Sequence, residues 1–393
     1  MSDDNLPLAG IQVVELSHMV MGPSIGLILA DLGADVIKVE PPGGDKTRRL
    51  RGSGAGYFTM YNRNKRSICV DVKSAEGLEI VRTMAGKADV LVENFRCGTM
   101  DRLGLSYDAM SADNARLVYC SARGFLSGPY AHRTALDEVA QMMGGLAYMT
   151  GPPGRPLRAG ASVIDVTGGM FGVIAVLAAL QQRERTGRGQ HVTSALFETT
   201  AFLVGQHMAQ LAVTGEPARP MPVRISAWAI YDIFDAADGE QVFVAVVSDG
   251  QWPKFCNAFG LEDLAADDGL AENAARVAAR ERILPRVREV FAGLTQAELM
   301  SRLEAVGLPY APVARPEDLF EDPHLSESGG LVDVTVPEGD ATRLPALPLE
   351  MGQGRPGVRR DVPTVGAHTD AVLAELGYDA ARIAALREAG VTG

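Results

Sequence analysis

The sequence predicts an α/β protein in which a doubly wound, Rossmann-like large domain is joined to a smaller α+β domain. Within residues 1–200, short apolar runs alternate with helix-length segments, a pattern typical of a parallel sheet covered by helices on both faces. The chain has 393 residues, more than one typical core needs. A proline-rich stretch then separates this part from two strand-like runs.

The first βαβ unit is predicted between residues 11 and 40. An apolar strand at 11–16 leads through a loop at 18–23 into a helix with apolar residues at helical spacing. Gly33 ends that helix, and a second apolar strand begins at Asp35. Ligands of such folds usually bind beyond the carboxyl ends of the strands. The loop at 18–23 is therefore a candidate part of a binding site.

Further strands are predicted near Ser67, Val90 and Val118, and the clearest later helix begins near Gly168. Residues 166–182 and 199–215 contain no Asp, Glu, Lys or Arg. Their glycine, threonine and glutamine residues favour buried helices over membrane spans.

The expected domain organisation has four parts. The large domain takes residues 1–200 and is completed by 330–393, and residues 201–224 form a linker whose clearest part is the proline-rich stretch 215–222. The small domain takes residues 225–325 and begins with a predicted hairpin of runs 229–234 and 241–247. Residues 326–393 form a return segment to the large domain, which is expected only from a family resemblance given below.

Composition narrows the functional classes. The formal net charge of −12 disfavours a nucleic-acid partner. The four cysteines are scattered, the six histidines are dispersed, and the acidic amino terminus lacks the basic and apolar parts of a signal peptide. We therefore expect a cytoplasmic protein with free thiols, no metal site and no membrane association.

One segment departs from the acidic average. Eight basic residues lie between positions 38 and 66, against only Glu40 and Asp45: Lys38, Lys46, Arg48, Arg49, Arg51, Arg63, Lys65 and Arg66. Such a basic island could bind a polyanionic small ligand through charge complementarity. The alternative is a solvated loop whose charges pair with one another.

Asp165 lies between an apolar approach and a predicted helix amino terminus. Its carboxylate could cap that helix by accepting hydrogen bonds from the first-turn amides. It could instead act as a nucleophile on a thioester carbonyl, with nearby glycine amides holding the developing oxyanion.

Several segments resemble one known family along nearly the whole chain. The longest is GPSIGLILADLGADVIKVEPPGGD at residues 22–45, and the others lie at residues 62–71, 89–98, 137–145, 186–190 and 366–377. In these segments the sequence resembles the family III CoA-transferases, typified by formyl-CoA transferase and carnitine CoA-transferase. The resemblance implies an interlocked homodimer, acyl-CoA and carboxylate substrates, coenzyme A as a substrate moiety, and no permanently bound cofactor, metal or ATP.

The resemblance also implies roles for individual residues. Asp165 aligns with the aspartate that the family acylates, with Gly169 placed as in the family pattern, and Asp137 aligns with an acidic active-site residue. Asp137 could alternatively cap its own helix. His18 is expected to face the acyl group, although a lone histidine after a strand is more often structural.

Further residues are expected to contact the cofactor or the substrate, some from the family pattern and others from their charge alone. The residues expected to bind the CoA moiety are Lys38, Asn94, Phe95, Arg102 and Arg133, of which Arg133 would substitute for a lysine that the formyl-CoA enzyme has at the position of Thr134. Arg48 and Arg224 are expected to hold a carboxylate of the substrate.

The expected activity is transfer of CoA from an acyl-CoA donor, with succinyl-CoA as the expected donor, to a small carboxylic or dicarboxylic acid. The route runs through an aspartyl anhydride and an enzyme-CoA thioester. An acyl-CoA racemase or epimerase of the same fold is an alternative, which Leu136 disfavours because racemases carry an acid/base histidine there. A non-catalytic CoA-binding protein is a second alternative. A dehydrogenase would need a glycine fingerprint that the chain lacks.

Overall fold

The structure, a computed structural model, describes residues 5–224, 226–337, 339–352 and 354–393. It divides into two compact units, which are described separately. The large unit comprises Met1–Pro222 and Pro323–Gly393, and the small unit comprises Val223–Asp322.

The centre of the large unit is a sheet of six parallel strands in the order β3-β2-β1-β4-β5-β6. The strands are β1 (Gln12–Leu16), β2 (Asp35–Glu40), β3 (Lys65–Cys69), β4 (Val90–Glu93), β5 (Val118–Arg123) and β6 (His191–Ala195). The predicted parallel sheet is confirmed, and the predicted strands match β1 to β5. The strand order reverses between β1 and β4, the point where such sheets bind ligands.

Helices cover both faces of this sheet, so it is doubly wound. One core joins α1 (Met21–Asp31) and α8 (Val163–Thr186) to the sheet, and a second core joins α3 (Ala75–Lys87) and the carboxyl-terminal helices to the opposite face. The remaining helices of the large unit are α2 (Tyr57–Tyr61), α4 (Thr99–Arg102), α5 (Tyr107–Asp113), α6 (Asp137–Met143), α7 (Leu146–Thr150), α9 (Leu196–Thr214), α15 (Pro323–Glu327), α16 (Thr369–Glu375) and α17 (Ala380–Glu388). Short 3-10 turns are η2 (Lys46–Arg49), η3 (Gly52–Gly54) and η4 (Met221–Val223).

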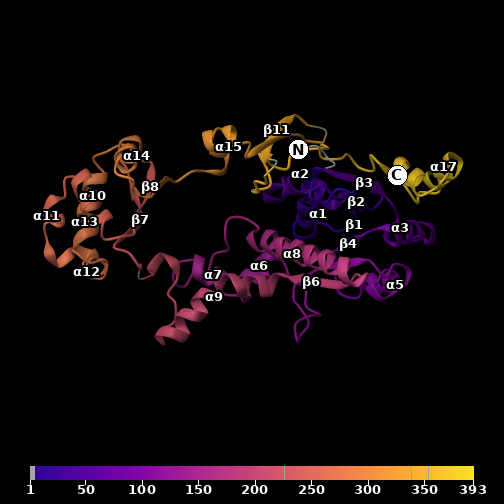
Figure 1. The fold of residues 1–393 in the computed structure, drawn as a ribbon, viewed down its shortest axis with the longest axis horizontal. Helices are drawn as coiled ribbons and strands as arrows, with labels where there is room; N and C mark the ends of the chain where they lie inside the picture. The colour runs from indigo at the N-terminus through magenta and orange to yellow at the C-terminus, as the bar shows by residue number, and fades with distance from the viewer. Residues whose placement is uncertain (1–4, 225, 338, 353) are drawn as a thin grey trace. The chain divides into compact units, whose positions relative to one another are not determined.

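Helix α8 packs closely against α1, and Figure 1 shows the two helices on the same side of the sheet. By length and composition α8 could span a membrane, but 44% of its most apolar window is buried. Val173 and Val176 lie in the core with α1. The predicted start near Gly168 was too late, since α8 begins at Val163.

Two expectations about α9 were wrong. Residues 201–214, placed in the linker, continue the helix, and only the stretch after Gly215 leaves it. Nor is α9 buried throughout: Phe202 is 72% and Val213 is 85% exposed. Its apolar side chains recur on all sides, and the single chain covers only one side of the helix.

The carboxyl-terminal segment lies against the start of the large unit, as Figure 1 shows by yellow helices near the indigo strand β3. The amide of Asp71 donates to the carbonyl of Val391 at 2.8 Å. Arg66 pairs with Glu375 at 2.7 Å. The segment also contains an antiparallel pair, β10 (Leu331–Thr335) and β11 (Ala341–Pro345).

The small unit has an antiparallel sheet in the order β7-β8-β9, made of β7 (Ile230–Asp235), β8 (Gln241–Val246) and β9 (Tyr310–Pro312). The predicted hairpin is confirmed by the β7–β8 pairing. The helices of this unit are α10 (Gln251–Ala258), α11 (Glu262–Ala265), α12 (Asn273–Ala278), α13 (Arg280–Phe291) and α14 (Gln296–Ala305), with turns η5 (Asp268–Leu270) and η6 (Pro316–Phe320). Phe234, Phe255 and Phe291 pack together in its core.

Candidate active site

A cavity of about 370 Å³ opens in the large unit beyond the carboxyl ends of β1, β4 and β5. It therefore lies where the strand order reverses. Its lining includes a set of polar residues from several segments: His18, Tyr57, Asn94, Arg96, Arg123, Arg133, Asp137, Glu138, Ser162 and Asp165. Most site residues expected from the sequence thus meet in one place.

The loops after β1 and β4 are bound to each other at the cavity. The backbone amide of His18 donates to Asn94 Oδ1 at 3.0 Å, and Asn94 Nδ2 donates to the His18 carbonyl at 2.8 Å. The rings of His18 and Phe95 stack with centroids 5.8 Å apart. Burial lowers the pKa of His18, so its imidazole is neutral at physiological pH.

A buried ion pair holds the backbone on both sides of Phe95. Glu93 Oε2 accepts from the Phe95 amide at 3.0 Å, and Arg123 Nη1 donates to the Phe95 carbonyl at 2.6 Å. Arg123 and Glu93 also pair with each other. The wall of the cavity beside His18 is therefore fixed by charged side chains.

Asp165 lies in the first turn of α8, three positions after the N-cap residue Ser162. Its side chain is partly buried and lines the cavity. Among the described residues, none donates a hydrogen bond to its carboxylate oxygens. The capping role that the sequence left open is not filled by this side chain, and the carboxylate faces the cavity unpaired.

Asp137 fills the capping role instead. Its Oδ2 atom accepts hydrogen bonds from the amides of Ile164 at 2.8 Å and Asp165 at 3.1 Å. Its Oδ1 atom accepts from Gln141. Asp137 is only 3% exposed. Asp137, which belongs to α6, therefore caps the amino terminus of α8. The alternative that it caps its own helix is not what the structure has.

The two carboxylates set the electrostatics of the site. Burial first, and then the charges of Asp137 and Glu138, raise the pKa of Asp165 to about 7, against an opposing effect of Arg158. Burial and the charge of Asp165 likewise raise the pKa of Tyr61 to about 12. A carboxyl group that lies in a cleft and has a pKa near 7 is a candidate functional group.

Sequence reasoning missed several residues here. Tyr57 and Ser162 line the cavity with their hydroxyl oxygens 3.3 Å apart. Arg158 pairs with Glu138 and lies 3.8 Å from Asp137. The sequence carried no signal for these contacts, because each joins segments that only the fold brings together.

Gly169 has a packing role. A Cβ atom there would lie 2.0 Å from Ser24 Oγ and 3.0 Å from the Met21 carbonyl oxygen. Its amide lies beyond the first four amides that a helix leaves unbonded. This amide is therefore not one of the free amides that could hold an oxyanion. The close approach of α1 to α8 requires that residue 169 have no side chain.

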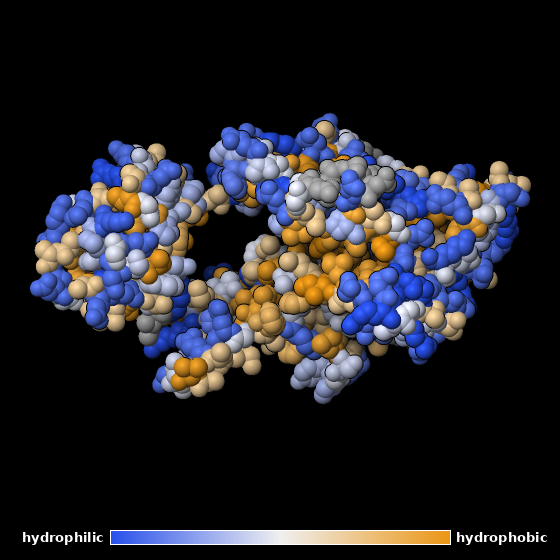
Figure 2. Space-filling model, in the orientation of Figure 1, coloured by the Kyte–Doolittle hydropathy of each residue, from blue (hydrophilic) through white to orange (hydrophobic). Residues whose placement is uncertain are grey.

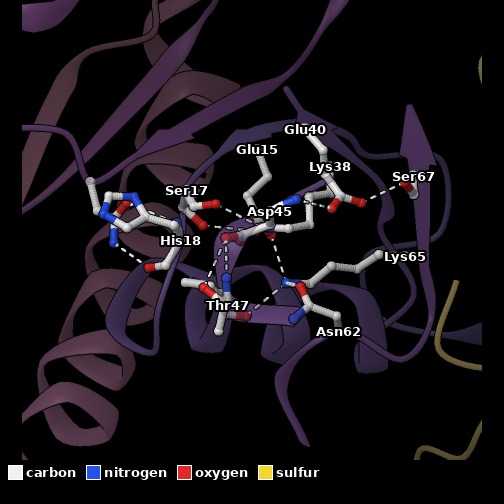
Figure 3. Close-up of polar contacts among 12 residues, drawn as sticks. Glu15, Ser17, His18, Lys38, Glu40, Asp45, Thr47, Asn62, Lys65 and Ser67 are labelled. Carbon is white, nitrogen blue, oxygen red and sulfur yellow. Dashed lines mark hydrogen bonds and ion pairs between the residues drawn. The ribbon is translucent and has the colours of Figure 1, made fainter. Parts of the chain in front are cut away.

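The basic island is largely a buried ion-pair network, as Figure 3 shows for Lys38 and Lys65. Lys38 is fully buried and pairs with Glu15 at 3.2 Å and Asp45 at 3.3 Å. This placement contradicts the expectation that Lys38 binds CoA. The alternative reading of paired charges is correct for Lys38, Arg48, Arg63, Lys65 and Arg66.

Neither arginine expected to hold a substrate carboxylate is among the residues that line this cavity. Arg48 donates two hydrogen bonds to Glu40, at 2.7 and 2.6 Å, and stacks on Phe58 at 3.6 Å. It is committed to that carboxylate and does not line the cavity. Arg224 belongs to the small unit, where its guanidinium lies 6.0 Å from the Tyr231 ring.

The remaining arginines differ in their access to the cavity. Arg133 lines it and stacks over Tyr130 at 4.9 Å. Arg102 is exposed, donates to Thr99 Oγ1 at 3.0 Å and does not contribute to the lining. Arg96, beside Phe95, does contribute. Within the described residues, no group of three His, Cys, Asp or Glu side chains is arranged to hold a metal ion.

A doubly wound sheet with an unpaired carboxylate at its switch point defines an α/β protein that acts on a ligand bound at the strand ends. Residues 8–369 match CoA-transferase family III, so the chain belongs to this family of CoA-transferases. Its membership of the family confirms the resemblance seen in the sequence.

Individual relatives agree with this assignment. The chain is 36% identical to a succinate–glutarate CoA-transferase of Agrobacterium fabrum over 94% of this chain and 96% of that protein. It is 33% identical to a succinyl-CoA:mesaconate CoA-transferase of Haloarcula hispanica, over 94% and 96%. A crystal structure of a CaiB/BaiF family protein from Brucella suis matches 95% of this chain and 100% of that one, with a TM-score of 0.84 and 36% identity.

Proposed function

We propose that this CoA-transferase moves CoA from succinyl-CoA to a short dicarboxylic acid, with Asp165 as the nucleophile. The observation that carries the proposal is the Asp165 carboxylate, which lines the cavity without a hydrogen-bonding partner among the described residues. The donor and the acceptor class are supported by what two relatives are named for, succinate–glutarate and succinyl-CoA:mesaconate transfer.

The proposed reaction exchanges one thioester for another in four steps. The Asp165 carboxylate attacks the succinyl-CoA carbonyl, which breaks the C–S bond and gives an aspartyl–succinyl anhydride and CoA thiolate. The thiolate attacks the aspartyl carbonyl, so an enzyme-CoA thioester forms and succinate leaves with the bridging oxygen. The acceptor carboxylate attacks that thioester, and the released thiolate then attacks the acceptor carbonyl. The new acyl-CoA leaves, and the Asp165 carboxylate is restored.

Asp165 is better suited to attack than Asp137. Both oxygens of Asp137 accept hydrogen bonds, and its side chain is almost fully buried. A nucleophilic oxygen must approach a carbonyl carbon directly, which is open only to Asp165. A pKa of about 7 also makes the Asp165 carboxylate more basic than an ordinary aspartate, and nucleophilicity rises with basicity.

The CoA moiety is proposed to lie along the wall formed by the loops after β1 and β4. Arg96 and Arg133 line this wall and offer charge to phosphates, and Phe95 offers an apolar face. Asn94 holds the His18 backbone with its side-chain amide, so its proposed role beside CoA is indirect.

The test is mass spectrometry of acyl-CoA species after the protein is incubated with succinyl-CoA and a panel of free acids. We expect one or more dicarboxylic acids to gain CoA as succinyl-CoA falls, with total thioester conserved. Asp165→Asn should lower the rate at least about 1,000-fold, because the amide is a poor nucleophile. Asp333→Asn changes an exposed aspartate on β10 and should leave the rate unchanged. Full activity of Asp165→Asn would overturn the proposal.

The same assay in deuterated water distinguishes the proposed transfer from the racemase alternative. A racemase would exchange the α-proton of an acyl-CoA without any acceptor acid, whereas the proposed transferase would not. Leu136 lines the cavity and is 57% exposed, and a leucine side chain cannot carry a proton. This placement supports transfer.

We further propose that the chain works as a homodimer. Apolar side chains on α8 and α9 face solvent in the single chain, among them Ile174 at 58% and Phe202 at 72% exposure. Figure 2 shows hydrophobic atoms gathered on this face over α8 and α9. Sedimentation analysis should give twice the chain mass, and Phe202→Glu should shift the measured mass toward that of the monomer.

The cytoplasmic location stays a prediction.

A further inference from the structure

The loop between β1 and α1 is held through its backbone by side chains from other segments. Lys38 Nζ donates to the Ser17 carbonyl at 2.7 Å, and the Met19 amide donates to Thr47 Oγ1 at 3.1 Å. His18, between them, is bonded to the loop after β4. Figure 3 shows Ser17, His18, Lys38 and Thr47 around this loop. Three consecutive residues are therefore fixed independently.

Met19 has an unusual backbone conformation. Its φ angle is 65°, in the left-handed region that a residue with a Cβ atom rarely adopts. Among the described residues other than glycine, it shares a positive φ only with Asn64. Such a conformation persists only where surrounding contacts over-determine it, and it often occurs at functional sites.

The contacts of Thr47 complete a closed chain of interactions. The Thr47 hydroxyl accepts from Met19 and donates to Asp45 Oδ1 at 2.8 Å. Asp45 pairs with Lys38 at 3.3 Å, and Lys38 returns to the Ser17 carbonyl. This series of interactions therefore begins and ends on the loop between β1 and α1.

This chain of interactions is sheltered from solvent. Thr47 is 2% exposed and Lys38 is fully buried. Charge-assisted hydrogen bonds are strong where water cannot compete for the donors and acceptors. The Thr47 hydroxyl is therefore a rigid anchor for the Met19 amide.

We infer that Thr47 is a positioning residue for CoA transfer, which rests on the proposed function. Its hydroxyl holds Met19 in the left-handed conformation and thereby places the His18 and Met19 side chains, which line the cavity. Without the hydroxyl, Met19 relaxes toward a negative φ, and the wall that contacts bound acyl-CoA moves. We therefore expect weaker substrate binding when the hydroxyl is removed. Thr47 does not line the cavity, so it takes no direct part in the chemical step.

The test compares Thr47→Val, Thr47→Ser and a control, Thr83→Val. Valine matches threonine in shape but lacks the hydroxyl, whereas serine retains it. Thr83 donates to the Glu79 carbonyl of its own helix. For Thr47→Val we expect KM for succinyl-CoA to rise about 10-fold with kcat within about 2-fold. Thr47→Ser and Thr83→Val should match the parent protein in both constants.

A merely structural role would give a different result. Loss of folded protein lowers the apparent kcat and the melting temperature while KM stays unchanged, and that outcome for Thr47→Val would overturn the inference. Failure of serine to rescue KM would overturn it as well.

A crystal structure of Thr47→Val separates this inference from the proposed function. If the parent protein transfers no CoA, the proposed function fails, but the variant still reports on the loop. We expect Met19 to leave the left-handed region in that structure. If Met19 keeps a positive φ without the hydroxyl, the inference is wrong whatever the activity.

Discussion

The buried carboxylate of Asp137 accepts a hydrogen bond from the backbone amide of Asp165 at 3.1 Å. One aspartate therefore anchors the helix turn that carries the other. The same contact brings two carboxylates close together in a partly dry site. Like charges resist joint ionisation, so the anchor also raises the pKa of Asp165. Asp137 therefore fixes the position of the proposed nucleophile and, after burial, is the second cause of its raised pKa.

The first prediction concerns the pH dependence of activity. The proposed attack needs ionised Asp165, and burial with the charge of Asp137 raises the pKa of Asp165 to about 7. We expect kcat/KM for succinyl-CoA to rise with pH through a midpoint near 7. In Asp137→Asn, the repulsion is lost while an acceptor oxygen for the α8 amides remains, so the midpoint should fall.

The control for this pH profile is Glu184→Gln, which changes an exposed carboxylate near the end of α8. It should leave the midpoint in place. A midpoint near 4 in the parent protein, or one that Asp137→Asn does not move, would show that Asp165 does not govern the profile.

The second prediction concerns stability. Between pH 4 and 7 the unfolded chain has lost the Asp165 proton, while the folded protein retains it because its pKa is raised from 3.8 to about 7. The unfolding free energy therefore decreases as pH rises through this range. Asp165→Asn removes this penalty, so at pH 8 it should be about 1–2 kcal/mol more stable than the parent protein. Urea unfolding at pH 4 and pH 8 measures the difference, which should shrink at pH 4.

The third prediction concerns the contact of α1 with α8. Gly169→Ala places a Cβ atom 2.0 Å from Ser24 Oγ and 3.0 Å from a backbone oxygen, so one helix must shift. We expect a loss of about 2 kcal/mol in unfolding free energy. Gly86→Ala is the matched control, because nothing lies within 4 Å of a Cβ atom at that helical position. It should be neutral or slightly stabilising, and equal effects of the two substitutions would contradict this account.

The fourth prediction concerns the buried charges. Lys65 contacts Glu15 at 2.8 Å, Asn62 at 3.0 Å and the Pro23 carbonyl at 2.9 Å, and its side chain is fully buried. Lys65→Met leaves Glu15 short of a partner and should cost about 3–5 kcal/mol in unfolding free energy. Adding Glu15→Gln should recover part of that loss, because Lys38 keeps Asp45 as its partner. Strictly additive losses would show that the two groups do not interact.

Local patterns predicted the elements of the large unit well. The strands near Ile11, Val36 and Val90 have apolar runs that depend only on neighbouring residues, and the structure has them as β1, β2 and β4. The burial of α9 was misjudged because residues 199–214, all of the helix after Glu198, contain no charged residue to mark a solvent-facing side. Its exposed apolar surface is a property of the assembled fold, which a single window of sequence cannot show.

The candidate site shows the same difference between residues predicted from local sequence and residues whose roles depend on the fold. Asp165 was found because its position before an apolar helix and its resemblance to a family pattern are both local. The roles of Lys38 and Arg48 were misjudged because their acidic partners were not recognised. Glu15 contacts Lys38 only because β1 pairs with β2. The cap that Asp137 provides to Ile164 likewise depends on the approach of α6 to α8.

The most direct test of the central claim is oxygen exchange between an acceptor acid and Asp165. The protein is turned over with succinyl-CoA and a dicarboxylic acid labelled with ¹⁸O in its carboxylates, then digested and analysed by mass spectrometry. The anhydride route predicts that ¹⁸O enters the Asp165 side chain, and after repeated turnover the released succinate, while Asp137 stays unlabelled. Label absent from Asp165 while labelled acyl-CoA accumulates would contradict the proposed nucleophile.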